Sequence, residues 1–122
     1  MSYNAINFND KFNLFNELWN PKVISEMNDY QFKLVKIQGE FQWHCHKYTD
    51  ETFIVLTGKI KIKFRDGEVT LNEGEMYVVP KGKEHKPFAD NLAKILIIEP
   101  KGVLNTGESK KSNLTAENDI WI

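Results

Sequence analysis

The sequence predicts one small all-β domain, a sandwich or a barrel, with a single short helix near its N-terminus. Three observations favour this fold class. At 122 residues the chain is long enough for one hydrophobic core but not for two. After residue 30, apolar and polar residues alternate in many short segments separated by Gly, Asp and Asn. Only one stretch, before residue 21, has the spacing of an amphipathic helix.

Aromatic residues recur at helical spacing in the N-terminal segment. Phe8, Phe12, Phe15 and Trp19 follow one another at intervals of four, three and four, and Pro21 ends the pattern. We therefore expect one helix with these aromatic side chains on one face. That face should pack against the barrel or against a partner subunit.

The predicted barrel spans residues 30–100, between a helical lead-in at 1–29 and a tail at 101–122. Lysines alternate with Ile and Phe at 59–64, which is typical of a strand with one face in solvent. A short strand at 23–24 precedes the barrel. The strands expected within the barrel are 30–38, 41–47, 51–56, 60–64, 68–71, 76–79 and 93–99.

The tail, residues 101–122, is polar for most of its length but ends in Ile120, Trp121 and Ile122. A disordered end would rarely finish on three large apolar residues. We expect this end to pack on the barrel or on a partner.

Three histidines and one glutamate form the candidate metal site. His44 and His46 are separated by one residue, so on an extended segment their side chains share a face and Cys45 points away. Glu51 opens the next apolar run, and His85 follows a turn that contains Pro and Gly. Imidazole and carboxylate groups are ligands of divalent metals. The pattern thus predicts a metal site built from separate strands.

Two stretches carry a resemblance to a known family. Residues 39–58 read G-x4-H-x-H-x4-E-x6-G, and residues 74–85 read G-x5-P-x-G-x2-H. This pair is similar to the paired motifs of the cupin superfamily, and the resemblance covers roughly residues 34–98. The first glycine is one residue closer to the histidines than in the common pattern, and Ala89 stands where asparagine is frequent. Neither departure falls on a ligand position.

The resemblance implies a double-stranded β-helix, or jelly-roll barrel, in which His44, His46, Glu51 and His85 bind one divalent metal ion. Asp50 is the rival carboxylate, and Glu51 is preferred because its place in the motif matches the family. Imidazole suits iron, nickel, copper and zinc, and a carboxylate also admits manganese, so the metal stays undetermined.

Neighbouring side chains are expected to line the pocket beside the ion. Alternation places Gln42 and Glu40 on the same face as the histidines, with Gln42 the nearer of the two. Phe53 is a third candidate. No side chain stands out as a catalytic acid or base, so the catalytic residues are unknown at this point.

Composition limits the partners and the location. A net charge of −1 gives no reason to expect binding to nucleic acid or to a membrane surface. The longest aliphatic run, 95–98, is too short to span a bilayer. The first residues do not resemble a signal peptide, and a single cysteine fits a reducing compartment. We expect a cytoplasmic protein. The aromatic stripe and the apolar strand at 51–56 also favour a homodimer built on the outer face of one sheet.

Three functions from different classes fit these features. The first is a metalloenzyme acting on a small organic molecule, and the resemblance suggests isomerisation of a sugar-like substrate or iron-dependent dioxygenation. The second is a module that binds or senses a small ligand through its metal without turnover. The third is a structural metal site. The fold alone does not decide among them, because such barrels host many chemistries.

Overall fold

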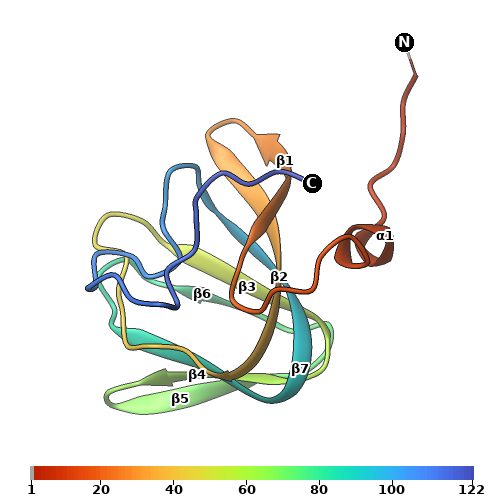
Figure 1. Ribbon diagram of the computed structural model, residues 1–122. Helices are drawn as coiled ribbons and strands as arrows, with labels where there is room; N and C mark the ends of the chain where they lie inside the picture. Colours follow the sequence, from red (N-terminus) through yellow and green to blue (C-terminus); the bar gives the residue numbers. More distant parts are fainter. Residues whose placement is uncertain (1) are drawn as a thin grey trace.

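The computed structural model describes residues 2–122, and its ribbon is mostly β-structure (Figure 1). One short helix precedes seven strands. The elements are α1 (Phe8–Phe12), β1 (Lys22–Met27), β2 (Tyr30–Glu40), β3 (Glu51–Thr57), β4 (Ile60–Phe64), β5 (Gly67–Leu71), β6 (Met76–Val79) and β7 (His85–Pro100).

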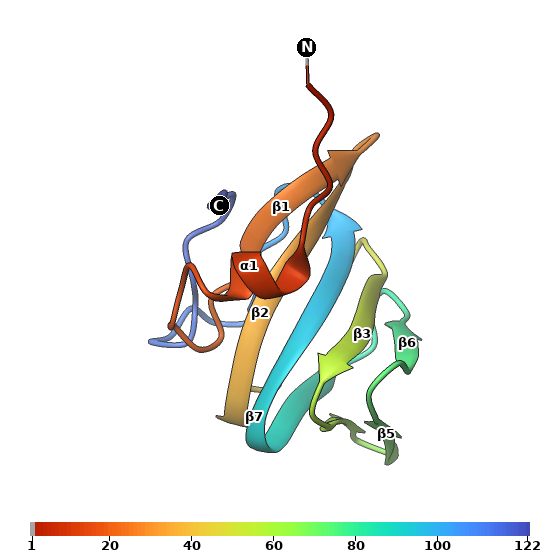
Figure 2. The same ribbon diagram turned by 90° about the vertical axis from the view of Figure 1, so that its right-hand side faces the viewer.

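All strand pairs are antiparallel, and the sheet runs β1-β2-β7-β3-β6, with β4 pairing both β5 and β7. The 16-residue strand β7 closes the fold. Its first residues, 85–88, pair with β4, whereas residues 93–100 pair with β2 and residues 94–98 pair with β3. In Figure 2, β7 bends sharply at the bottom of the view, so one strand serves both layers. The predicted all-β jelly roll is confirmed.

Alternation along β2, β3 and β7 sends every second side chain into the barrel. Twelve buried apolar residues make up the interior core: Val35, Ile37, Phe53, Val55, Ile60, Ile62, Leu71, Val79, Ala89, Ala93, Ile95 and Ile97. These side chains come from β2 to β7 and from widely separated parts of the chain.

The interior changes character along its length. At one end, which we call the apolar end, β2, β3 and β7 contribute the buried residues Ile37, Val55, Ala93 and Ile95. At the other end the same strands contribute buried polar groups. This polar end consists of Gln31, Lys33, His44, His46, Glu51, His85 and Glu99.

The outer face of the sheet carries a second apolar cluster. Helix α1 lies across β1 and β2 in Figure 2, and Phe12 and Phe15 are buried there against Ile24, Leu34 and Leu96. Further along the same face, over β7, β3 and β6, no helix covers the sheet in this view. We call this region the outer-face patch, and it consists of the half-buried Ile54, Leu56 and Ile98 and the exposed Met76 and Val78.

The N-terminal helix is much shorter than predicted. It ends at Phe12, with Asn13 as its C-cap, so the predicted single stripe from Phe8 to Trp19 is wrong beyond the first two aromatics. Short polar side chains such as asparagine compete with helical hydrogen bonding. Trp19 has φ +60° and packs against the interior core, not on the outer face beside Phe15.

The predicted strand at 41–47 is also absent. Apart from an isolated bridge between His44 and His85, residues 41–50 form a loop. Its backbone groups bond to other loops, since Gly82 N–H donates to the His46 carbonyl and Glu108 N–H donates to the Cys45 carbonyl. The other predicted strands occur, and β6 matches its predicted bounds, while β7 begins eight residues earlier than expected.

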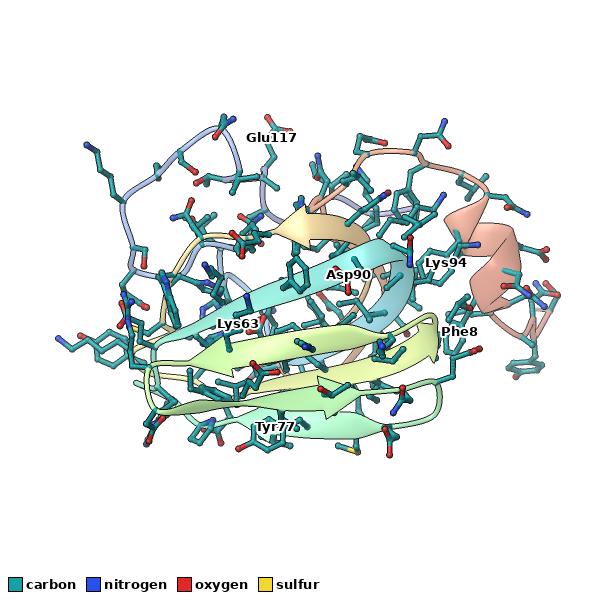
Figure 3. All side chains as sticks on the ribbon, turned by 90° about the horizontal axis from the view of Figure 1, so that it is seen from below. Phe8, Lys63, Tyr77, Asp90, Lys94 and Glu117 are labelled. Atoms are coloured by element: carbon teal, nitrogen blue, oxygen red, sulfur yellow. The ribbon has the colours of Figure 1, made fainter. Side chains whose placement is uncertain are left out.

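The tail, residues 101–122, packs against the barrel. Its end bonds to β1, where Val23 N–H donates to the Ile120 carbonyl and Ile122 N–H donates to the Val23 carbonyl. In Figure 3 the labelled Glu117 marks the tail on the side of the molecule opposite Tyr77 of β6. Within residues 2–122, no helix is both long enough and apolar enough to cross a membrane.

Candidate metal centre

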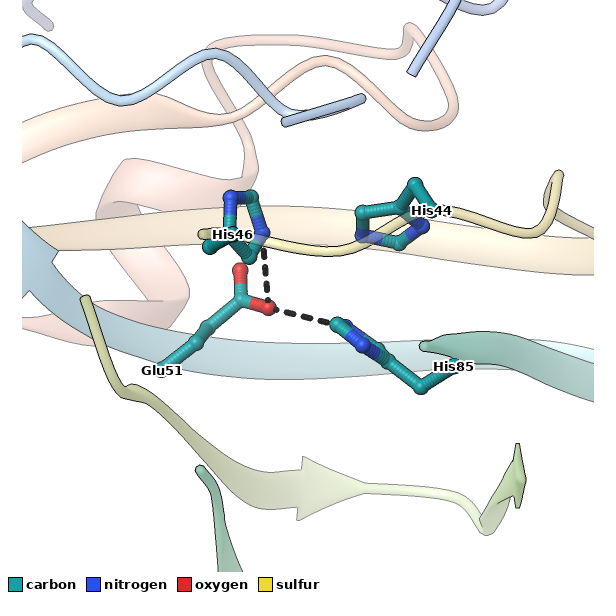
Figure 4. A group of neighbouring side chains, drawn as sticks. All are labelled: His44, His46, Glu51 and His85. Carbon is teal, nitrogen blue, oxygen red and sulfur yellow. Dashed lines mark hydrogen bonds and ion pairs between the residues drawn. The ribbon is translucent and has the colours of Figure 1, made fainter. Parts of the chain in front are cut away.

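The four predicted ligands come together in the polar end of the barrel. His44 and His46 lie in the loop after β2, Glu51 is the first residue of β3, and His85 is the first residue of β7. All four are buried, and one ligand atom from each lies within 4.8 Å of the others. Figure 4 shows the three imidazoles grouped around the Glu51 carboxylate.

The Glu51 carboxylate lies between two of the histidines. Its Oε1 atom is 3.2 Å from His46 Nε2 and 3.3 Å from His85 Nε2. The ring centroids of His44 and His85 are 4.3 Å apart. Nitrogen and oxygen donors at these separations can all face one central ion.

Backbone carbonyls orient two of the imidazoles. His44 Nδ1 lies 3.0 Å from the Gln42 carbonyl oxygen, and His85 Nδ1 lies 2.9 Å from the Lys83 carbonyl oxygen. Because a carbonyl can only accept, each Nδ1 carries a proton, which leaves Nε2 as the ring nitrogen that would bind a metal ion. This arrangement is typical of histidines that bind metals through Nε2.

The charges of the site suit a cation. Burial lowers the pKa of His44 to about 4, with His85 adding to the effect, so His44 is neutral at pH 7. Burial alone would lower the pKa of His46, but the adjacent Glu51 carboxylate outweighs it and raises this pKa. Burial would likewise raise the pKa of Glu51, whereas His46 and His85 lower it well below its usual range. Glu51 therefore stays an anion.

Residues 32–99 match the family model of the cupin domain, which is more than half of the chain. The chain belongs to the cupin family.

Two solved structures and one curated protein resemble this chain. A cupin-2 domain protein from Shewanella frigidimarina shares 65% identity, with a TM-score of 0.78 over 80% of this chain and 95% of the other. Protein NMB1881 from Neisseria meningitidis shares 35% identity, with a TM-score of 0.73 over 80% of this chain and all of the other. YdbB of Bacillus subtilis is 42% identical over 64 residues, and the match spans 52% of this chain and only 57% of YdbB.

The donor set of this cupin fits a divalent metal ion. His46 supports this fit most directly, because both of its ring nitrogens are buried, neither makes a hydrogen bond in the described part of the chain, and Nε2 has only the 3.2 Å ion-pair contact with Glu51 Oε1. A buried polar atom without a partner is costly, and a metal ion would satisfy one of the two nitrogens. Three imidazoles and one carboxylate leave open positions on a six-coordinate ion.

The tail fixes the loop that carries two of the ligands. Lys47 N–H donates to Glu108, and Gln42 Nε2 donates to the Lys110 carbonyl oxygen. Gly107 has φ +59°, and a Cβ atom there would lie 2.1 Å from the Cys45 carbonyl oxygen. Only glycine allows the tail to approach the loop so closely.

A cavity of about 30 Å³ lies beside the metal ligands. His44 and Glu51 line it on one side, and Glu99 is a third ionisable group in its wall. The remaining lining is almost entirely apolar and consists of Trp19, Pro21, Val35, Ile37, Phe41, Phe53, Pro87, Ile95 and Ile97, with Asn105 from the tail.

The other predicted pocket residues are distributed differently. Phe53 lines the cavity, but Gln42 and Glu40 do not. Gln42 turns to the tail, where its amide bonds to Ser112 and Lys110, and the exposed Glu40 pairs with Lys63 and Lys86. Strict alternation does not hold here because residues 41–50 form a loop.

The rival carboxylate, Asp50, is exposed and lies away from the ligand cluster. Its Oδ1 atom accepts a hydrogen bond from Lys81 N–H at 2.8 Å, so it ties the loop to the turn before β7. Cys45 is half-buried and is not among the clustered ligands.

Sequence reasoning missed three buried polar residues of the barrel, Gln31, Lys33 and Glu99. A signal was present, because Glu99 continues the inward alternation of Ile95 and Ile97. A charged residue in phase with buried apolar residues indicates a polar group inside the barrel.

Proposed function

We propose that this cupin is a metal-dependent enzyme that acts on a small, mainly apolar organic molecule. The observation that carries this proposal is the position of the cavity, which is lined by His44 and Glu51, two of the four buried, convergent donors. A site that serves only to hold a structural ion needs no adjoining space. A reactive site needs space beside the ion for its substrate.

The residues of the chain would have distinct roles in such a reaction. His44, His46, Glu51 and His85 would hold the metal, and the carbonyls behind His44 and His85 would keep two rings in a binding orientation. The apolar walls would exclude water and orient the substrate. When bound, a divalent ion would polarise an oxygen atom of the substrate or, if it is iron, support chemistry with dioxygen.

The lining of the cavity favours one type of substrate over another. Sugars carry a hydroxyl on nearly every carbon, and each buried hydroxyl needs a polar partner. Apart from Asn105, the cavity offers only the metal ligands and Glu99 as polar groups. This favours dioxygenation of a small apolar substrate over isomerisation of a sugar. Proteins described as a hydroquinone 1,2-dioxygenase and a putative sugar phosphate isomerase share this fold at only 17% and 20% identity, so they do not decide the question.

Binding without turnover is the competing function, and a structural ion is the third. The twelve-residue apolar core argues against a structural ion, because it buries apolar side chains from six strands and includes none of the four metal ligands. Nothing comparable argues against a ligand-binding module, so only an assay of turnover separates it from an enzyme.

The first experiment is metal analysis of the purified protein after loading with iron, manganese, zinc, nickel or copper. We expect one ion per chain in the wild type, and little or none in His44→Ala and Glu51→Gln. Glu84→Gln, which changes an exposed glutamate, is the matched control and should bind the metal normally. A screen of metabolite mixtures for conversion by the loaded protein follows. Failure to bind any of these metals would overturn the proposal, and binding with no conversion would favour the ligand-binding module.

We also propose a homodimer formed by the outer-face patch. The patch joins two exposed side chains of the edge strand β6 to half-buried residues of β3 and β7, and a second copy would cover this apolar area. Light scattering should report twice the chain mass of 14.2 kDa for the wild type and one chain mass for Ile54→Glu. Lys61→Glu, on β4, serves as the control. A monomeric wild type at micromolar concentration would refute this assembly.

The cytoplasmic location expected from the sequence also stays a prediction.

A further inference from the structure

The polar end of the barrel contains a second group of buried polar residues that the metal site does not use. Glu99 and Lys33 are 2% and 3% exposed, and Lys33 Nζ donates to Glu99 Oε1 at 2.8 Å. Gln31, on β2, pairs directly with Glu99 in the sheet. On the other side of β7, Ile98 pairs with Thr52 of β3, so the next residue, Glu99, lies beside the metal ligand Glu51. Glu99 is therefore flanked by Gln31 on β2 and by Glu51 on β3.

One oxygen of Glu99 is available to a ligand. While Oε1 accepts from Lys33, Oε2 is buried and makes no hydrogen bond within residues 2–122, and burial together with the neighbouring Glu51 carboxylate raises the pKa of Glu99 to about 8. Glu99 also lines the cavity beside His44 and Glu51. A buried carboxylate oxygen without a partner is costly, so it is rarely found without a role.

The wall facing this oxygen is apolar and is held under local strain. Trp19 stacks on Phe41 with ring centroids 4.8 Å apart, and both line the cavity. The φ of +60° at Trp19 is unfavourable for a bulky residue. Three hydrogen bonds hold this conformation. The backbone N–H of Trp19 donates to the Lys36 carbonyl oxygen, and its indole Nε1–H donates to the Gln38 carbonyl oxygen. The Trp19 carbonyl oxygen accepts from the Asn105 side chain.

The size of the cavity limits what it can bind. At about 30 Å³ it has room for roughly two or three waters. A molecule with a single ring would fit only if the half-buried Trp19 moved outward. Larger molecules would require the barrel itself to open.

We propose that this cavity binds a small, mainly apolar molecule that carries one hydroxyl group, and that Glu99 Oε2 forms a hydrogen bond with that hydroxyl. A hydroxyl both donates and accepts, so it matches Glu99 in either protonation state. Lys33 acts as a positioning residue, because its ammonium group holds Oε1 and so directs Oε2 toward the ligand. This inference rests on the proposed function in one respect only, which is that the cavity beside the metal is the substrate pocket.

The test compares phenol with toluene, which has nearly the same shape but no hydroxyl. Binding is followed by two-dimensional NMR of the zinc-loaded protein and, in parallel, of the metal-free protein. We expect the wild type to prefer phenol by about tenfold, the typical gain from one hydrogen bond to a charged group. The indole N–H signal of Trp19 should shift during the titration.

The double variant Lys33→Met/Glu99→Leu should bind phenol and toluene equally. Both members of the ion pair are replaced, so neither buried charge is left alone. The matched control is Lys61→Met/Glu68→Leu, which makes the same substitutions at an exposed pair and should keep the preference for phenol. Circular dichroism and zinc content check that each variant is folded and can bind metal.

Two results would overturn the inference. One is that neither probe binds to the wild type, and the other is that the preference for phenol survives in the double variant. Because metal-free protein is titrated as well, these outcomes are distinct from a failure of the metal site. If the metal site failed, the wild-type protein would contain no zinc after loading, but it would still prefer phenol to toluene in a way that depends on Glu99.

Discussion

The apolar and polar ends of the barrel interior are built by the same three strands but differ in how completely their atoms are satisfied. At the apolar end Ile37, Val55, Ala93 and Ile95 are at most 1% exposed and pack in a cluster of apolar side chains, and Ile37 and Ile95 also line the cavity. At the polar end, charged and polar side chains take the inward positions of β2, β3 and β7, and the loop after β2 adds His44 and His46.

The two ends differ most clearly in the number of buried side-chain nitrogen and oxygen atoms that lack a hydrogen-bond partner. Among the described residues there are four, Gln31 Oε1, His46 Nδ1, His46 Nε2 and Glu99 Oε2, and all belong to the polar end. Buried polar atoms are normally hydrogen-bonded, because an unsatisfied one costs about 1–3 kcal/mol. We conclude that the apolar end supplies stability, whereas the polar end is arranged for a metal ion and a ligand.

The largest expected effect comes from damage to the apolar end. Ile95→Ala should lower the free energy of unfolding by about 2–5 kcal/mol, because it leaves a cavity in a closely packed region. Urea denaturation followed by circular dichroism measures the change. A loss below about 1 kcal/mol would mean that this end is loosely packed and would weaken the comparison.

Loss of a metal ligand should affect metal binding instead of folding. His44→Ala removes one of four ligands, and we expect a loss of metal affinity of at least about 100-fold, which exceeds the 10- to 100-fold typical of lost outer-shell partners. The β-sheet circular dichroism signal should survive both this substitution and chelation of the wild type at neutral pH. Unfolding on chelation would show that the metal is structural, since binding energy would then be folding energy.

A smaller effect is expected from pH. Since the pKa of His46 is raised, its ring stays protonated to a higher pH than free histidine, and a metal ion must displace that proton. Affinity should therefore fall by about tenfold for each pH unit below this pKa. His44, with a pKa of about 4, should contribute no further loss above pH 5. Titrations of the metal at pH 8, 7, 6 and 5.5 test the slope, and a constant affinity would contradict it.

How much the sequence could predict depended on whether the relevant signal was local. Strand β6 matches its predicted bounds because glycine and proline mark both of its ends. The four metal ligands are brought together as expected, since each stands at a fixed place within a short motif.

The features that sequence reasoning missed depend on contacts between distant segments. The inward phase of Glu99 can be read from Ile95 and Ile97, but only the pairing of β2 with β7 makes Lys33 its partner inside the barrel. Trp19 fits a helical stripe by spacing, yet hydrogen bonds to Lys36 and Gln38 hold it against the interior. Loop 41–50 depends in the same way on the tail, more than sixty residues away in the sequence.

The smallest expected effect is that of the double substitution Lys33→Met/Glu99→Leu, which converts part of the polar end into an apolar one and is compared with the single substitution Glu99→Leu. Removing a single partner of a buried ion pair leaves an uncompensated charge, so Glu99→Leu alone should cost about 3–5 kcal/mol. Lys33→Met/Glu99→Leu removes both charges and fills the space with apolar atoms, and its free energy of unfolding should stay within about 1 kcal/mol of the wild type. Urea denaturation of the metal-free proteins measures both values. If the double variant were as unstable as the single one, the ion pair would be a structural element of the barrel. A double variant of unchanged stability would show instead that folding does not require the pair, as expected if it is there to bind a ligand.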